Sequence, residues 1–228
     1  MSIDTPNPSD MRISYDKDQL NESDLASNPL DQFTKWLAEA VAVGPEALIE
    51  PNAMVIAVRN DADVVSTRSV LLKGIDSRGL TFYTNYGSDK AGSIAANSQV
   101  SVTFPWYPLH RQVNVVGTAT KVSREESAAY FETRPHGSKL GAIVSAQSSV
   151  IDSREILEKR MAELEAQYPE GTSVPLPDVW GGYLIEVSTI EFWQGRRSRL
   201  HDRLRFVKNG SSSDLSDVSA WKVIRLSP

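Results

Sequence analysis

Alternation of apolar and polar residues with a period of two dominates the middle and the end of the chain. From residue 53 the sequence reads AMVIAV, VVSTRSVLLKGI and LTFYTN, separated by the polar turns NDAD and DSRG. QVSVTFPWY and RQVNVVGTATKV follow, and the last quarter of the chain adds GYLIEVSTIEFWQ, LRFV and WKVIRL. This period is typical of strands with one buried face, so these runs predict consecutive antiparallel strands.

Four other stretches place apolar residues three or four positions apart, which predicts helices. Asn28 and Pro29 provide the first with an N-cap and a proline at its first position. Strands in succession, without regular alternation of strand and helix, predict a mainly β fold with peripheral helices (α+β): an antiparallel barrel and not a doubly wound sheet. The remaining helix signals are Ser88, the capping-box pair Ser123 and Glu126 with Pro135 as the end of that helix, and an amphipathic stretch from Ser153 to Tyr168.

The first 26 residues differ from the rest because they are polar and lack periodic apolar positions. Such a segment cannot bury enough apolar surface to order itself. We therefore expect residues 1–26 to be a mobile N-terminal arm and residues 27–228 to form a single domain. Arg12 and Tyr15 place a cation and an aromatic ring in this arm.

Composition excludes several classes of function. The 228 residues carry a net charge of −5, which argues against a nucleic-acid or membrane-binding surface. The chain has no cysteine, and its three histidines form no H-x-x-x-H pair, so we expect no metal site. The start, MSIDTPNPSD, lacks signal-peptide features and no apolar run is long enough to span a membrane, so we expect a cytoplasmic protein.

Positive charge is concentrated in one place, EFWQGRRSRLHDR. Five arginines stand against Glu191 and Asp202 between residues 191 and 205, a local net charge of +3. A single basic patch on an acidic chain suggests a small anionic ligand. Arg199, His201 and Arg203 are two positions apart, so they would share one face if this stretch is extended. They could then form a site together with Trp193, or they could be a hydrated edge of the sheet.

Other candidates for an anion site are spread along the chain. Arg68 and Lys73 lie five positions apart on one predicted strand and so face opposite sides unless a bulge intervenes. Lys90 lies at a predicted helix start directly after a strand. Backbone N–H groups at such a start can bind phosphate, but an ordinary capped helix explains the same pattern. Tyr130 and Arg134 are four residues apart on a predicted helix and so share a face, and Ser138 follows just beyond. The three could bind an anion together, or Tyr130 and Arg134 could be an ordinary surface pair. Gln147, Ser148 and Ser149 could contact a ligand or form a turn.

Taken in order, the motifs RISY, RSVLLK, FYTN, FPW, RQV, YFxxRP, QSS, PLP…WGGY, FWQG…RLHDR and WKVIRLSP resemble the pyridoxine (pyridoxamine) 5′-phosphate oxidase family over nearly the whole chain. The resemblance implies a split β-barrel, a homodimer with FMN at the subunit interface, and oxidation of pyridoxine or pyridoxamine 5′-phosphate to pyridoxal 5′-phosphate. It also implies O₂ as acceptor and hydrogen peroxide as product.

By motif, the resemblance also assigns residues. It implies that FMN is held by Arg68, Tyr83, Thr84, Lys90, Gln112, Gln147, Ser148, Trp193 and Arg203. It implies that the substrate is held by Lys73, Tyr130, Arg134 and Ser138, with Arg199 and His201 over the pyridine ring as catalytic residues and Arg12 and Tyr15 closing the site.

Two positions depart from the family pattern. Asp89 stands where a basic residue is usual beside the lysine of the phosphate site, and Ile13-Ser14 replaces a more polar pair in the arm. Asp89 keeps open the alternative of a flavin- or pyridoxal-phosphate-binding protein without turnover. A second alternative follows from the resemblance in fold, because relatives of this fold use other reductants or F420: a split-barrel oxidoreductase that uses flavin or F420 on another substrate.

Overall fold

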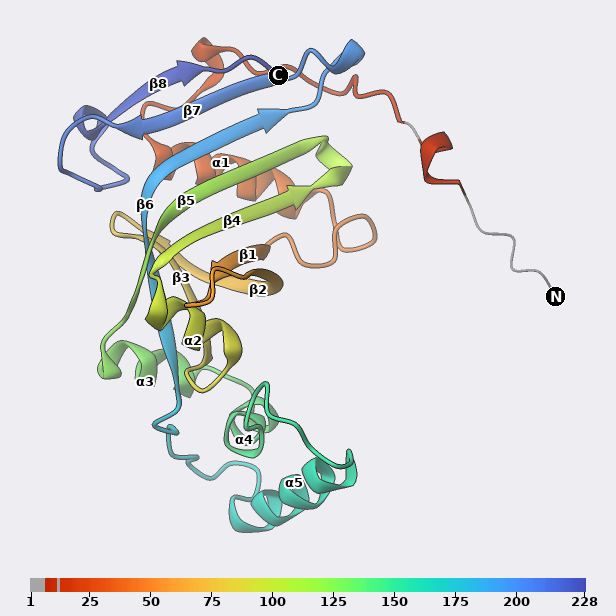
Figure 1. The fold of residues 1–228 in the computed structure, drawn as a ribbon, viewed down its shortest axis with the longest axis vertical. Helices are drawn as coiled ribbons and strands as arrows, with labels where there is room; N and C mark the ends of the chain where they lie inside the picture. The colour runs from red at the N-terminus through yellow and green to blue at the C-terminus, as the bar shows by residue number, and fades with distance from the viewer. Residues whose placement is uncertain (1–6, 12) are drawn as a thin grey trace.

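Six antiparallel strands form a closed barrel in the computed structural model, which describes residues 7–11 and 13–228. The strand order is β3-β2-β1-β4-β5-β6, and pairing between β3 and β6 closes the ring. β7 and β8 continue the sheet beyond β6 (Figure 1). The strands are β1 Ala53–Arg59, β2 Val65–Asp76, β3 Gly79–Asn85, β4 Gln99–Trp106, β5 Arg111–Lys121, β6 Trp180–Gln194, β7 Asp202–Lys208 and β8 Trp221–Arg225.

The longest strand, β6, connects the two ends of the molecule. One edge of β6 pairs with β5, while its other edge pairs first with β3 through residues 180–185 and then with β7 through residues 189–194. At about 3.3 Å per residue, its 15 residues measure on the order of 45 Å along the strand. Figure 1 shows β6 running from the helices at one end of the molecule to β7 and β8 at the other.

Five α-helices lie outside the barrel. Asn28 caps the first helix, because its side chain accepts a hydrogen bond from the Asp31 N–H at 2.9 Å. That helix buries Phe33 and Trp36 against the strands. The last three helices lie together beyond the end of the barrel (Figure 1). The helices are α1 Pro29–Ala42, α2 Asp89–Ala96, α3 Arg124–Glu132, α4 His136–Val144 and α5 Glu155–Gln167, and short 3₁₀ turns cover Pro8–Asp10, Glu22–Asp24, Tyr107–Leu109, Arg197–Arg199 and Val218–Ala220.

Two separate hydrophobic cores hold these elements. The larger core fills the barrel with inward-facing residues such as Met54, Ile56, Phe82 and Phe104, all fully buried. The smaller core packs α3 and α4 against the start of β6 and contains Phe131, Leu140, Ala142, Val174 and Trp180. The two cores meet near β3, which places polar residues of β2 and β3 at a boundary between barrel and helices.

Most of the predicted elements are confirmed, with two corrections. α4 was not predicted; it begins directly after Pro135, which ends α3 as expected. Ser88 occupies the N-cap position of α2, but its side chain makes no cap hydrogen bond and instead donates to the Asn85 carbonyl at 2.7 Å. Ser123 does cap α3, accepting from the Glu126 N–H at 3.0 Å. The division at residue 26 stays a prediction.

Candidate functional site

Two adjoining cavities lie where the barrel meets α3 and α4. The first, here the Lys90 cavity, has a volume of about 410 Å³ and is lined by Thr84, Lys90 and Gln147 among others. The second, here the Lys73 cavity, has a volume of about 350 Å³ and is lined by Lys73 and Tyr130 among others. Tyr83, Arg134, Ser138 and Trp180 line both.

The Lys90 cavity contains a buried cation surrounded by neutral oxygens. The Lys90 ammonium donates to Thr84 Oγ1 at 2.6 Å, Gln147 Oε1 at 2.7 Å and Ser88 Oγ at 3.0 Å. Burial and, to a lesser extent, the nearby charge of Arg68 together lower the pKa of Lys90 to about 8, while Asp89 acts in the opposite direction. Lys90 forms no ion pair with any described residue, so its charge is available to an anion.

The start of α2 places further polar groups next to Lys90. The Asp89 N–H donates to Ser148 Oγ at 3.2 Å, which brings the loop after α4 against the helix start. Ser148 has a left-handed backbone, with φ of 73°. The polar group Gln147–Ser148, which the sequence left open as site or turn, therefore lies beside Lys90, whereas the Asp89 side chain is exposed.

Arg68 and Lys73 lie in different surroundings on β2, and a bulge at Lys73 is the exception that the spacing argument left open. Arg68 is paired with Ile56 across β1 and so shares the face of that buried residue, whereas Lys73 is exposed at a bulge between Leu72 and Gly74. Arg68 Nη2 donates to Ser66 Oγ at 2.7 Å. Its Nη1 is buried and has no hydrogen-bond partner among the described residues.

The Lys73 cavity brings together four residues predicted to act as a set: Lys73, Tyr130, Arg134 and Ser138. The guanidinium carbon of Arg134 lies 4.6 Å from the centre of the Trp180 ring and 5.6 Å from that of Phe131. Burial lowers the pKa of Arg134, and its Nη1 is buried without a hydrogen-bond partner in the described part of the chain. A buried charged donor in this state is strongly stabilised by an oxyanion.

Tyr83 forms the wall between the two cavities. Its ring stacks on Tyr130 with centroids 4.0 Å apart and on Trp180 with centroids 5.4 Å apart. Burial raises the pKa of Tyr83, so its hydroxyl stays protonated at neutral pH. Trp180 was missed as a site residue, because only its place in the WGGY motif marks it in the sequence.

The other predicted site residues gather at the far end of β6. Gln112, Trp193 and Arg203 are paired across β5, β6 and β7. The His201 ring lies 4.6 Å from that of Trp193, and the Tyr15 ring lies 5.8 Å from His201 and 5.9 Å from Trp193. Arg12 lies outside the described residues.

His201 is held in one tautomer. Its Nδ1 accepts a hydrogen bond from the Arg196 N–H at 3.0 Å, so the proton of the neutral ring is on Nε2. Burial lowers the pKa of His201, and the charge of Arg199 lowers it further, with Asp202 opposing. His201 is therefore a neutral hydrogen-bond donor at pH 7.

The predicted extended alternation of Arg199, His201 and Arg203 is wrong. Residues 197–199 form a 3₁₀ turn in which Ser198 and Arg199 have φ values of 58° and 61°, and β7 begins only at Asp202. Arg199 is exposed at this turn.

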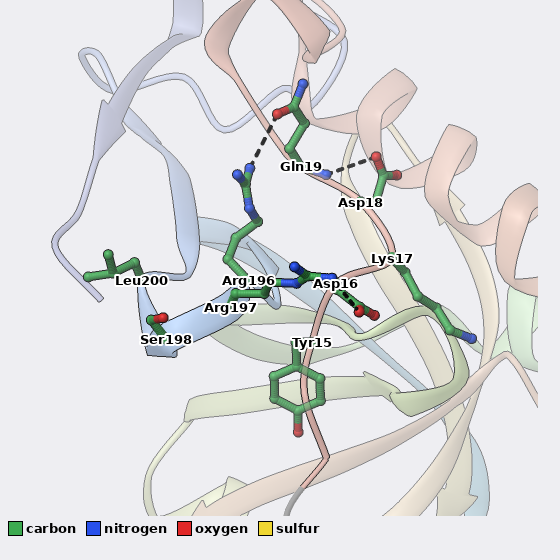
Figure 2. A pocket seen from close by; sticks show the side chains of 9 residues that line it. All are labelled: Tyr15, Asp16, Lys17, Asp18, Gln19, Arg196, Arg197, Ser198 and Leu200. Atoms are coloured by element: carbon green, nitrogen blue, oxygen red, sulfur yellow. Dashed lines mark hydrogen bonds and ion pairs between the residues drawn. The ribbon is translucent and has the colours of Figure 1, made fainter.

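Acidic side chains balance most of the charge of the basic run. Arg197 pairs with Asp16 at 3.0 Å and Arg196 with Asp202 at 3.1 Å. Figure 2 shows residues 15–19 of the arm beside the β6–β7 connection, with Arg196 reaching Gln19 and Arg197 reaching Asp16. Arg203 and Arg205 both bind the buried carboxylate of Glu191. The interpretation that the whole run neutralises ligands is therefore wrong for this chain: only Arg199 of its five arginines forms no ion pair with a described residue.

One chain does not bring its two groups of candidate residues together. Trp180 lines both cavities at the start of β6, and Trp193 lies near its end. Thirteen steps of extended strand separate the two residues by about 40 Å along the strand.

Two further findings concern metals and membranes. In residues 7–11 and 13–228, no three His, Cys, Asp or Glu side chains are grouped so that they could hold a metal ion. Within the same residues, no helix is both long and apolar enough to cross a membrane. A cytoplasmic location stays a prediction from the sequence.

Comparison with known proteins identifies the family. Residues 45–168 match the family described as pyridoxamine 5′-phosphate oxidase, and residues 180–228 match the pyridoxine 5′-phosphate oxidase C-terminal dimerisation region. The chain belongs to the pyridoxamine 5′-phosphate oxidase family. Two relatives called pyridoxine/pyridoxamine 5′-phosphate oxidase are similar over nearly their full lengths. The protein of Streptomyces avermitilis is 50% identical over 97% of this chain and 96% of its own, and that of Rhodopirellula baltica is 48% identical over 96% and 95%.

Solved structures support the split-barrel fold of this oxidase family. PhzG from Burkholderia lata 383, in complex with tetrahydrophenazine-1-carboxylic acid, has a TM-score of 0.81 at 29% identity and covers 92% of this chain and 98% of its own. A pyridoxamine 5′-phosphate oxidase-related, FMN-binding protein of Nostoc punctiforme has a TM-score of 0.67 at 14% identity over 86% and 97%. The second likeness concerns the fold alone.

The residues around the Lys90 cavity fit a phosphorylated cofactor of the kind this oxidase family implies. A phosphate group needs several donors and a net positive field. Lys90 lines the cavity, the charge of Arg68, whose Nη1 has no partner in the described chain, acts on Lys90, and the Ser148 hydroxyl lies at the start of α2, while Asp89 contributes a negative charge close to Lys90.

Proposed function

We propose that this protein is an FMN-dependent oxidase that converts pyridoxamine or pyridoxine 5′-phosphate to pyridoxal 5′-phosphate. With the amine substrate, water and O₂ are consumed, and ammonia and hydrogen peroxide are released. The observation that carries this proposal is a pair of buried arginine nitrogens without a partner among the described residues: Arg134 Nη1, whose residue lines both cavities, and Arg68 Nη1, whose charge acts on Lys90. Two such groups suit two phosphorylated molecules bound side by side.

The Lys90 cavity would hold the cofactor. Arg68, Lys90 and Ser148 would bind its phosphate, with Thr84 and Gln147 keeping the Lys90 ammonium in place. FMN supplies, when bound, the acceptor of the two electrons that leave the substrate and are passed to O₂. Tyr83 would separate cofactor and substrate phosphates, since its ring lines both cavities.

The Lys73 cavity would hold the substrate phosphate. Arg134 would donate from its free Nη1, Lys73 would add a second charge, and the Tyr130 and Ser138 hydroxyls would complete the set. A dianion held by two cations and two hydroxyls is fixed in place, so the carbon to be oxidised is positioned at a set distance from the phosphate.

A second copy of the chain would complete each site. The Trp193 end of β6 lies about 40 Å along the strand from the cavities, so its residues reach a ligand there only from a partner chain. The partner would then bring Gln112, Trp193 and Arg203 to the cofactor, and Tyr15, Arg199 and His201 to the substrate ring, with Arg12 as part of the closing arm. The match of residues 180–228 to a dimerisation region supports this homodimer.

His201 would act as a donor to the substrate and not as a cation. Its ring is neutral at pH 7 and fixed by the Arg196 N–H, so Nε2–H is the group that it presents. Arg199 beside it would provide the fixed positive charge, because an arginine does not deprotonate.

Likeness to PhzG suggests a second candidate, oxidation of a reduced phenazine carboxylate. This ligand also carries an anionic group, so a cation in the cavity does not distinguish the two. Two features favour the phosphate ester: identity near 50% to the oxidases against 29% to PhzG, and the fourfold set of donors around the Lys73 cavity.

Anaerobic reduction of the bound flavin tests the proposal. The purified protein should carry FMN near stoichiometry, and stopped-flow mixing with pyridoxamine 5′-phosphate should bleach its visible absorption. Tetrahydrophenazine-1-carboxylic acid is the matched comparison. Bleaching by the phenazine alone would favour the second candidate, and flavin that neither compound reduces would contradict both and indicate a binding protein.

A further inference from the structure

We propose that Trp180 is a positioning residue of the Lys73 cavity, which holds the Arg134 guanidinium through its ring face and so keeps Nη1 free for the substrate phosphate. The inference rests on the proposed function, because it takes the Lys73 cavity as the place of that phosphate. The carrying observation is the half-buried Arg134 guanidinium, whose carbon lies 4.6 Å from the centre of the Trp180 ring and whose buried Nη1 has no partner among the described residues.

Aromatic rings hold the Arg134 guanidinium in place, and no described carboxylate pairs with it. An acidic partner would orient the guanidinium but would also neutralise the charge that must attract the substrate. An aromatic face attracts a cation through its quadrupole and leaves the net charge of +1 unchanged. Trp180 and Phe131 therefore orient Arg134 without competing for its donors, and the Trp180 ring is the nearer of the two.

Trp180 is itself firmly held. It is the first residue of β6, where its N–H donates to the Pro177 carbonyl at 3.1 Å and its carbonyl accepts from Arg124 Nη1 at 3.2 Å. Its side chain is 6% exposed and packs on Phe131, with ring centroids 5.2 Å apart and planes at 64°. The indole plane is thus fixed by the backbone and by the smaller core.

The same indole extends to a second substrate residue. Trp180, Tyr83 and Tyr130 have ring planes within 20° of one another. A side chain at Gly182, two residues along β6, would bring its Cβ to 2.8 Å from Tyr83 Cε1, so the glycine allows Tyr83 to lie this close. Trp180 thus contacts Arg134 directly and Tyr130 through this stack, which makes it a determinant of the cavity's shape.

Binding of inorganic phosphate to the FMN-loaded enzyme tests the proposal without turnover. Calorimetric titration of W180L should give a dissociation constant about tenfold above wild type, because the ring that orients Arg134 is lost. W180F keeps an aromatic face and should stay within about threefold of wild type. FMN content and thermal melts of both variants provide the check on folding.

A double-mutant cycle with R134M gives the sharper result. If Trp180 acts through Arg134, W180L should change phosphate affinity by less than about twofold in the R134M background. In steady-state kinetics of W180L, KM for pyridoxamine 5′-phosphate should rise about tenfold while kcat changes by less than about twofold. Pyridoxamine without its phosphate should show no such rise, since it does not use the cavity.

Two results would overturn the inference: folded, FMN-loaded W180L that binds phosphate like wild type, or a W180L effect of full size in the R134M background. If W180L does not fold, W180F is used instead. Its phosphate affinity should be about two- to threefold weaker than that of wild type, and this difference should disappear in the R134M background. An unchanged phosphate affinity of W180F would then overturn the inference. Failure of the proposed function can be told apart from failure of this inference. If pyridoxamine phosphate does not bleach the flavin, the proposed function is wrong, but the phosphate titrations can still be measured.

Discussion

Cations at the two ends of β6 differ in whether acidic side chains pair with them. Around the cavities at its start, Arg68, Lys73, Lys90 and Arg134 form no ion pair with a described residue. At its other end, Arg196, Arg197, Arg203 and Arg205 are paired with acids, and Arg111 and Arg225 bind Asp18 and Glu22 of the arm. The paired arginines bind parts of the protein to one another, whereas the cations around the cavities keep an unpaired charge for a ligand.

This contrast has a physical basis. A buried charge without a partner costs free energy of folding, which the smaller core and the barrel have to offset. Lys90 and the Nη1 atoms of Arg68 and Arg134 are buried cationic groups of this kind. At the arm end, the carboxylates of Asp16, Asp18 and Asp202 provide the partners, and the charge there holds residues 15–22 of the arm against the strands.

The largest effect should come from removing an unpaired cation. R134M should lower kcat/KM for pyridoxamine 5′-phosphate by about 10²- to 10³-fold, because the substrate phosphate loses a charged donor in a desolvated site. Its melting temperature should not fall, since a buried partnerless charge is removed. R197M, which breaks an exposed pair with Asp16, should change kcat/KM by less than about threefold. Equal losses in the two variants would contradict the contrast.

Removing the acid that pairs with Arg203 and Arg205 should instead lower the stability of the fold. Burial raises the pKa of Glu191, but hydrogen bonds from Arg203 and Arg205 outweigh this and lower it overall. E191Q should reduce the free energy of unfolding by about 3 kcal/mol, since two arginines lose their buried partner. E186Q breaks a more exposed pair with Lys208 and should cost less than about 1 kcal/mol in the same urea titration. A loss below about 1 kcal/mol in E191Q would mean that the cluster is already solvated.

The depressed pKa of Lys90 predicts a pH dependence of cofactor binding. With a pKa of about 8 in the folded apoprotein, the ammonium loses its proton above that pH and no longer attracts the phosphate, so the FMN dissociation constant should rise about tenfold between pH 7 and pH 9. The unfolded chain binds more protons than the folded one between pH 8 and 10.5, so this group should make the apoprotein more stable as pH rises through that window.

K90M provides the control for both parts of this prediction. It should bind FMN weakly at every pH and lack the rise in apoprotein stability, as fluorescence titration and thermal melts would show. A wild-type FMN affinity that is flat from pH 7 to pH 9 would mean that Lys90 does not contact the phosphate.

The smallest effect is expected at Asp89, the acid beside the cofactor cavity. D89R replaces a repelling charge by an attracting one, and the side chain is exposed, so FMN should bind about fivefold more tightly at low salt and less so at high salt. Apoprotein stability should fall slightly, because an acid at a helix start is favourable. D89N should show an intermediate FMN affinity. Unchanged binding of FMN to D89R at low salt would mean that residue 89 faces away from the phosphate.

Local patterns in the sequence predicted the fold well. Every strand follows from period-two alternation, and α1 from its Asn28-Pro29 start. α4 was missed because Pro135 reads as an end, although the next residue starts a new helix. The pairing of β3 with β6 joins segments about 100 residues apart, and nothing in either strand specifies its partner.

The site was predictable where its residues are neighbours in the chain. Tyr130, Arg134 and Ser138 are close in sequence and reach one cavity, but the predicted shared helix face is wrong, because α3 ends at Glu132 and Arg134 lies in the turn before α4. The ion pairs of the basic run were not predictable, because Asp16 lies 181 residues from Arg197. The 3₁₀ turn at Arg199 was missed because an arginine rarely has a positive φ.

Mixing two inactive variants tests the central claim, that cavities of one chain are completed by the other end of β6 from a partner. R134M removes a cavity residue and H201A a residue of the far end, and each homodimer should be inactive. If the two residues serve one site from different chains, half of the randomly mixed dimers have one intact site, so refolded equimolar mixtures should recover about a quarter of wild-type activity. Mixtures that recover no activity, with heterodimers shown to form, would place Arg134 and His201 in the same chain's site and contradict the account.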